Sequence, residues 1–277
     1  MSDNVVPFPG AASHPSLEIG LATVQMGAKP IAHKGVNDTF HGEVLLASGE
    51  IKLAYIKDLD ARELANELLV AALGQALGLP MPRVHLAMVP IGIMPVSKAP
   101  TAADGSAFVL ASEDAEAPSL KQFYNVADQS VYNAIVQRIV QWKDIDALYC
   151  VDTWCANVDR NIGNVLVDGG SFWMIDHGRC FSGPSWVATA LDPSAAYQNK
   201  ISAWLTPKIP VDQRMVVAKR AVERVVLPDV LLDTAVSLSQ ARRFLSATEQ
   251  DAVTAFIKDR RAHLPAITAA ALSVLVA

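Results

Sequence analysis

One short segment in the middle of the chain constrains the fold most, because it predicts a β-hairpin with polar residues at its open end. Two apolar runs, 165–167 and 171–175, flank Asp168-Gly169-Gly170. Asp-Gly and Gly-Gly between apolar runs are strong hairpin signals, since glycine adopts the positive φ angles that tight turns need. If the turn centres on Gly170, Asn164 and Asp176 lie opposite each other, roughly 5 Å apart at Cβ.

The two facing side chains suit one hard cation. An amide oxygen and a carboxylate are ligands that magnesium accepts, and Asp159 lies in the loop just before the hairpin. Two oxygen ligands for magnesium and a third carboxylate that orients a hydroxyl are typical of a phosphoryl-transfer site. The structural alternatives are that Asn164 and Asp176 only cap the hairpin ends, and that Asp159 forms an Asx turn after a helix.

Composition excludes several classes of protein. The chain has 277 residues, 51% hydrophobic and 18% charged, so it forms one large domain or two packed lobes. A formal charge of −5 with no basic run argues against direct nucleic-acid binding. No apolar stretch reaches the ~18 residues of a membrane span, and no signal peptide is expected. Three cysteines without a CxxC pair predict no disulfide framework and no zinc site, so we expect a cytoplasmic protein.

Hydrophobic periodicity predicts strands first and helices afterwards. The expected strands are 41–47, 51–57, 84–89 and 107–111. The expected helices are 61–77, 129–142, 144–156, 212–226, 228–238 and 246–264, with a last apolar helix within 266–277. We therefore predict an α+β protein with a flexible tail (1–16), an N-lobe (17–113) and a mainly helical C-lobe (114–277), with the site near their junction.

Two segments in this order resemble the catalytic and metal-binding segments of the protein-kinase-like superfamily. They are Asp159-Arg160-(three residues)-Asn164 and Ile175-Asp176-His177-Gly178. The form is closer to phosphatidylinositol kinases and HipA-like kinases than to ordinary protein kinases. Two features favour the HipA-like branch. One is Val151-Asp152-Thr153-Trp154 leading into Asn157-Val158-Asp159-Arg160, and the other is Leu53-Ala54-Tyr55-Ile56-Lys57 followed by Asn66-Glu67-Leu68 and Leu77-Gly78-Leu79-Pro80-Met81-Pro82. The resemblance covers roughly residues 40–182. It implies a two-lobed kinase fold, with a β-rich, nucleotide-binding N-lobe (17–113) containing one helix and a helical, catalytic C-lobe (114–277) containing the catalytic hairpin.

The resemblance also assigns roles. Asp159 is expected to be the catalytic base, and Asn164 and Asp176 are expected to hold magnesium. Lys57 is expected to contact the α and β phosphates of ATP, and Glu67 is expected to pair with Lys57. Alternatives remain from the residues themselves: Lys57 as a solvated strand end, and Glu67 as a surface residue, because it lies off the leucine stripe of its helix as Glu63 does.

Nucleotide-covering residues are harder to find in this sequence. The candidate segment, 34–42, has only Gly35 and Gly42, and a Walker A motif is absent. Lys34, Gly35 and Glu113 are the expected further nucleotide-binding residues.

Residues around the catalytic loop have open roles. Asp152 is expected to hold the loop by hydrogen bonds, and Asn157 either braces its backbone or caps a helix. Arg160 is expected to pair with a carboxylate or a phosphate. His177 either tunes Asp176 or packs as a spacer.

The expected function is that of an ATP- and magnesium-dependent HipA-like kinase acting on a Ser or Thr hydroxyl of a protein. The expected partners are ATP and a protein substrate or regulatory partner, for example within a bacterial toxin–antitoxin pair, with no membrane partner. Two alternatives stay open. One is a small-molecule or lipid kinase of the same fold, and the other is a nucleotide-binding pseudokinase that acts as a regulatory module.

Overall fold

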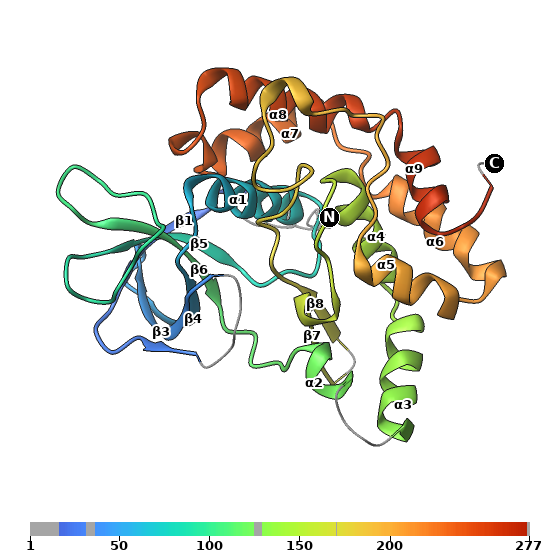
Figure 1. Ribbon diagram of the computed structural model, residues 1–277, viewed down its shortest axis with the longest axis horizontal. Coiled ribbons are helices and arrows are strands. Elements are labelled where there is room, and N and C mark those ends of the chain that lie inside the picture. The colour runs from blue at the N-terminus through green and yellow to red at the C-terminus, as the bar shows by residue number, and fades with distance from the viewer. Residues whose placement is uncertain (1–16, 32–36, 125–128, 170, 276–277) are drawn as a thin grey trace, which may run out of the picture.

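A β-sheet with one helix beside it forms one side of the molecule, and a larger helical assembly forms the other (Figure 1). This computed structural model describes residues 17–31, 37–124, 129–169 and 171–275, so the expected tail 1–16 lies outside it. The strands are β1 Gly20–Val24, β2 Lys29–Pro30, β3 Thr39–Leu46, β4 Ile51–Lys57, β5 Val84–Val89, β6 Ala107–Glu113, β7 Val165–Asp168 and β8 Ser171–Met174. The helices are α1 Ala61–Ala76, α2 Leu120–Tyr124, α3 Gln129–Val140, α4 Ile145–Trp154, α5 Lys200–Leu205, α6 Val211–Glu223, α7 Asp229–Leu238, α8 Ala247–Arg260 and α9 Leu264–Ala271. The expected α+β class and order of elements are confirmed, while β1, β2, α2 and α5 were not predicted.

The large sheet closes on itself. Its order is β1-β5-β6-β4-β3-β2, and β1 also pairs with β3, so five of its strands form a ring. Small apolar side chains fill the interior, among them Ala54, Ala87 and Ala111, all fully buried. Small residues suit a narrow barrel, because side chains fill the interior of such a barrel completely.

Helix α1 packs between this barrel and the C-terminal helices. Asp60 caps its start by accepting from the main-chain N–H groups of Arg62 and Glu63, both at 2.9 Å. Gly78, with φ of +61°, follows its end. Every residue from Glu63 to Gly74 is buried, so neighbours cover all faces of the helix and not only its leucine stripe. The surface alternative for Glu67 and Glu63 is therefore wrong.

The central hairpin is present, but its expected register is wrong by one residue. Asp168 pairs with Ser171 and Val165 pairs with Met174. Two residues thus connect the strands, whereas the expected register needed three, and Asn164 lies opposite Ile175. The N–H of Ile175 donates to the carbonyl of Asn164 at 3.1 Å. Asp176 follows immediately with φ of +66°, which is unusual for a non-glycine residue and bends the chain at the hairpin's end.

The C-terminal helices depart from expectation at one point. Ser246 and Glu249 form the reciprocal capping box at the start of α8. The single helix expected over 246–264 instead ends at Arg260, and α9 starts at Leu264 with a proline in its first turn. Pro265 has no N–H to donate to the preceding turn, so the chain begins a new helix there. In the part of the chain that the structure describes, no helix is long and apolar enough to span a membrane.

Candidate active site

Lys57 lies between two carboxylates that come from distant parts of the chain. Its Nζ is 3.3 Å from Oε1 of Glu67 on α1 and 3.1 Å from Oδ1 of Asp176 after β8. The Lys57 side chain is 14% exposed, so it is not a solvated strand end. The structure therefore brings together three of the residues that the sequence singled out, and it joins the barrel to the hairpin at this point.

The electrostatics of this group favour a charged lysine. Burial alone lowers the pKa of the Lys57 ammonium, but the charges of Asp176 and Glu67 outweigh it and raise the pKa above its usual value. Burial raises the pKa of Glu67, against the opposing effect of Lys57. Lys57 lowers the pKa of Asp176, whose side chain is half exposed. Asp176 is thus a carboxylate at neutral pH that also faces solvent.

Asn164 and Asp176 are the residues that would hold a metal ion. No group of three or more His, Cys, Asp or Glu side chains suited to a metal occurs among the described residues. Magnesium does not need such a group, because it keeps several waters and binds through one or two carboxylates together with substrate phosphates. A half-exposed ionised carboxylate beside an amide-bearing residue fits this chemistry, although the register shift means that the two are not direct cross-strand partners.

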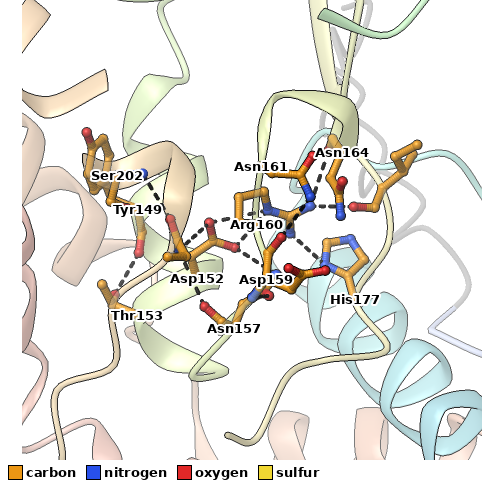
Figure 2. A network of polar contacts seen from close by, with 12 residues as sticks. Tyr149, Asp152, Thr153, Asn157, Asp159, Arg160, Asn161, Asn164, His177 and Ser202 are labelled. Carbon is orange, nitrogen blue, oxygen red and sulfur yellow. Dashed lines mark hydrogen bonds and ion pairs between the residues drawn. The ribbon is translucent and has the colours of Figure 1, made fainter. Parts of the chain in front are cut away.

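A buried network around Arg160 holds the loop that carries Asp159, the candidate catalytic loop (Figure 2). Arg160 is fully buried, and its Nε donates to Oδ1 of Asp152 at 3.0 Å. Its Nη1 donates to the carbonyl oxygens of Asn164, at 3.2 Å, and Ile175. These two residues face each other at the open end of the hairpin. Arg160 therefore pairs with a carboxylate, not with a phosphate, and ties the loop to the hairpin.

Asp152 and Asn157 brace the same loop. The amide of Asn157 donates to Asp152 at 3.2 Å, and its oxygen accepts from the main-chain N–H of Asp159 at 3.1 Å. Asn157 therefore braces the backbone next to Asp159, as one of the two sequence interpretations held. Asp152 is 3% exposed and reaches the loop through side chains on both sides of Asp159.

His177 packs inside the site as a neutral ring. Its Nδ1 lies 2.8 Å from Nη2 of Arg160. Because a guanidinium only donates, Nδ1 must accept, and the proton of the neutral imidazole lies on Nε2. Burial and then the charge of Arg160 hold the pKa of His177 well below its usual value. His177 is therefore a packed, buried residue, as the spacer interpretation held, and Arg160 is its polar partner.

Asp159 faces solvent and two cations. Lys200 Nζ lies 3.3 Å from its Oδ1, and Arg179 Nε lies 3.8 Å from its Oδ2. The Asp159 side chain is 39% exposed, so an incoming hydroxyl can reach it. The sequence pattern did not single out Lys200. It lies 41 positions from Asp159, and no local spacing rule connects the two.

The expected nucleotide-covering residues are only partly placed. Lys34 and Gly35 lie outside the described residues. Gly42 lies within β3, opposite Ala54. The carboxylate of Glu113 accepts a hydrogen bond from His85 at 2.8 Å. Glu113 lies opposite Ala54 of β4, so the two side chains share one face of the sheet. Lys57 lies three residues further along β4, and its side chain therefore points to the opposite face of the sheet. The structure therefore does not bring the Glu113 side chain to Lys57.

Asn66 is a further residue of the site, and the sequence analysis quoted it in a motif without giving it a role. It is fully buried, and its amide donates to the carbonyls of Gly178 at 2.7 Å and Cys180 at 3.3 Å. Its oxygen accepts from Trp186 Nε1 at 3.0 Å. Asn66 precedes Glu67 on α1, so it anchors the segment after Asp176 to the helix that carries the partner of Lys57. A polar residue on a helix expected to be leucine-rich was the available signal.

A separate hollow of about 520 Å³ opens between α3, the turn after it and β8. Its lining includes Arg138, Trp142 and Trp173 and none of the candidate site residues. The site described above is thus identified by its side-chain arrangement and not by the depth of a cavity.

The barrel that carries Lys57, the helix that carries Glu67 and the hairpin that ends at Asp176 together have the arrangement of a kinase-type fold. The family model for HipA-like kinases matches residues 49–226, more than half of the chain, and this chain belongs to that family. All the residues discussed from Lys57 to Lys200 lie within the match.

Two solved structures are similar to this chain at low sequence identity. The crystal structure of the Helicobacter pylori proinflammatory kinase CtkA is 15% identical, with a TM-score of 0.51 over 90% of this chain and 96% of that one. A golgi casein kinase is 11% identical, with a TM-score of 0.42 over 90% of this chain and 73% of that one. The similarity to CtkA supports the two-part kinase fold alone. No curated protein matches the sequence.

Proposed function

We propose that this HipA-like kinase uses ATP and magnesium and transfers the γ-phosphoryl group to a Ser or Thr hydroxyl of a protein. The observation that carries the proposal is the position of Lys57 between Glu67 and Asp176. A lysine held by a helical glutamate and lying next to a solvent-facing aspartate can meet nucleotide phosphates beside a metal ion. We also propose that residues 17–113 carry the nucleotide and residues 114–277 the catalytic loop.

Each residue has a defined task in this proposal. Lys57 binds the α and β phosphates, and Glu67 keeps its ammonium in place. Asn164 and Asp176 would hold magnesium, which would supply positive charge beside the phosphoryl oxygens. Asp159 accepts the hydroxyl proton and orients its oxygen for in-line attack. Asp152, Asn157 and Arg160 keep the loop in register with the hairpin.

The main test combines nucleotide binding with turnover. ATP binding is measured by calorimetry with and without magnesium, and labelled γ-phosphate is followed in the same samples. We expect magnesium-dependent binding and transfer of label in the wild type, and loss of both in Asp176→Ala. Asp168→Ala is the matched control, since it removes an exposed carboxylate from the tip of the same hairpin.

Three outcomes separate the alternatives. Label on protein Ser or Thr supports the proposal, whereas label only on a small molecule or lipid redirects the acceptor. Magnesium-dependent binding with no turnover, even with candidate acceptors present, favours the regulatory pseudokinase. Absence of ATP binding in the wild type rejects the mechanism. We place the protein in the cytoplasm within this proposal, because all three of its cysteines are free.

A further inference from the structure

The segment that carries Lys200 is built into the catalytic loop, although it is distant in sequence. Asn199 is 7% exposed, and its amide donates to Oδ2 of Asp152 at 3.1 Å and to the carbonyl of Asn157 at 3.4 Å. Its oxygen caps α5 by accepting from the N–H of Ser202 at 2.9 Å. The N–H of Ile201 donates to the carbonyl of Arg160 at 3.0 Å. The residues on both sides of Lys200 are thus fixed to the loop around Asp159.

Lys200 itself is free to move at its end. Its side chain is 74% exposed, and its contact with Asp159 is one exposed ion pair. Such pairs contribute little to stability, because water screens them and the long side chain loses entropy on pairing. A hydrogen-bonded backbone segment that presents an exposed ammonium beside the proposed catalytic carboxylate indicates a binding role more than a structural one.

The charges in the site divide into two groups of opposite sign. On one side, Lys57 meets two carboxylates, Glu67 and Asp176, so this group has a net negative charge that suits a divalent cation. On the other side, the two cations Lys200 and Arg179 meet the single carboxylate of Asp159. This second group has a net positive charge, and an anion complements it.

A catalytic base receives the hydroxyl on a carboxylate oxygen, and each such oxygen can accept more than one hydrogen bond. Arg179 and Lys200 lie against different oxygens of Asp159, so a hydroxyl that reaches either oxygen comes close to one of these cations. Lys200 is the more exposed of the two, at 74% against 37%, and therefore the more accessible to an anionic group of the acceptor.

We propose that Lys200 and Arg179 form the anion-binding arm of the acceptor site, so that the preferred protein segment carries an acidic side chain next to the accepting Ser or Thr. This inference rests on the proposed kinase function and specifies its substrate class. The same arm also suits the γ-phosphoryl group of ATP, and the experiment is arranged to separate these two sources of negative charge.

Binding of designed peptides tests the proposal directly. Short alanine-based peptides with a central serine are flanked by glutamate, alanine or lysine, and their binding is measured by fluorescence anisotropy with magnesium and a non-hydrolysable ATP analogue. We expect the glutamate-flanked peptide to bind about tenfold more tightly than the lysine-flanked one. Lys200→Glu should remove or reverse this preference while the affinity for the nucleotide analogue stays unchanged.

Lys219→Glu is the matched control. Lys219 is a similarly exposed lysine on α6, at 76%, where it pairs with Glu223. We expect it to leave peptide preference unchanged, and thermal melts establish that both variants are folded. A glutamate in the first turn of α5 is compatible with the helix, because a negative charge is favourable at a helix N-terminus.

Several results would overturn the inference. They are equal binding of the three peptides, no measurable peptide binding, or an acidic preference that survives in Lys200→Glu. Weaker nucleotide binding in Lys200→Glu with unchanged peptide preference would assign the arm to the γ-phosphoryl group instead. Magnesium-dependent nucleotide binding by the wild type is recorded separately, so a failure of the kinase proposal is distinguished from a failure of the acceptor proposal.

Discussion

At the scale of single residues, the ammonium of Lys57 has the largest electrostatic role in the site. It neutralises part of the charge of two carboxylates, one of them buried, and it faces the position proposed for the nucleotide phosphates. Under the proposed function, removing it deprives the transition state of a fixed positive charge, and it leaves Glu67 buried without its partner.

We therefore expect Lys57→Met to reduce phosphoryl transfer by about 100-fold or more, the range found when one preorganised charge-stabilising donor is removed. The measurement is transfer of labelled γ-phosphate under saturating magnesium and ATP. Lys52→Met on the same strand is the control, because Lys52 pairs with Glu50 at the surface and should leave transfer unchanged. Full activity of Lys57→Met would contradict the role given to this residue.

Asp152 provides a residue-scale test of stability. It is buried against Arg160, Asn157 and Asn199, so Asp152→Ala leaves a guanidinium without its counter-ion. We expect the free energy of unfolding to fall by about 3–5 kcal/mol, measured by urea titration. Asp233→Ala, which breaks an exposed pair with Lys258, should cost less than about 1 kcal/mol. Similar losses in the two variants would show that the buried network does not hold the loop.

At the scale of elements, β3 passes very close to the residue that precedes β2. A Cβ atom added to Gly42 would lie 2.7 Å from Cα and 2.8 Å from Cβ of Ala28, closer than real contacts allow. Because Gly42 has no Cβ atom, the backbone of β3 can come this close to Ala28. The sequence analysis had instead placed Gly42 in the nucleotide-covering segment.

We expect Gly42→Ala to destabilise the protein by about 1–3 kcal/mol, because the two backbone segments must separate. The control is Ala47→Gly just beyond the same strand, where no close contact is created and a loss within about 1 kcal/mol is expected. Unfolding by urea or heat measures both. A neutral Gly42→Ala would mean that β2 moves away from β3 without cost.

At the scale of the whole molecule, the three cysteines test how tightly the interior packs. Cys150, Cys155 and Cys180 are each at most 1% exposed, and all lie in the main core cluster. Burial raises the pKa of Cys150 to about 12 and raises the pKa of Cys155 and Cys180 as well. The reactive form of a thiol is the thiolate, which forms only above the pKa.

All three thiols should therefore stay protonated and unreactive toward Ellman's reagent in the native protein at pH 8. Three equivalents should react after unfolding in guanidinium, where the pKa of each thiol falls back to its ordinary value and raising the pH increases the rate. Rapid reaction of even one thiol in the native state would indicate an opening of the core around α4.

The sequence by itself determined the local elements and the types of residue at the site. Hairpin, strand and helix signals depend on residues a few positions apart, so 51–57 and 84–89 were predicted with the bounds that the structure has. The spacing of Asp159, Asn164 and Asp176 indicated the family for the same reason. The register of the hairpin was one residue off, because a Gly-Gly turn allows more than one connection length.

Only the tertiary structure decided what covers each polar residue. Periodicity marks the leucine face of α1, but it cannot show that the segment after Asp176 covers the face with Asn66 and Glu67. The closure of β1 onto β3 and the approach of Lys200 to Asp159 likewise join residues at least twenty positions apart. Such contacts arise from packing of the whole chain, and local sequence patterns carry no record of them.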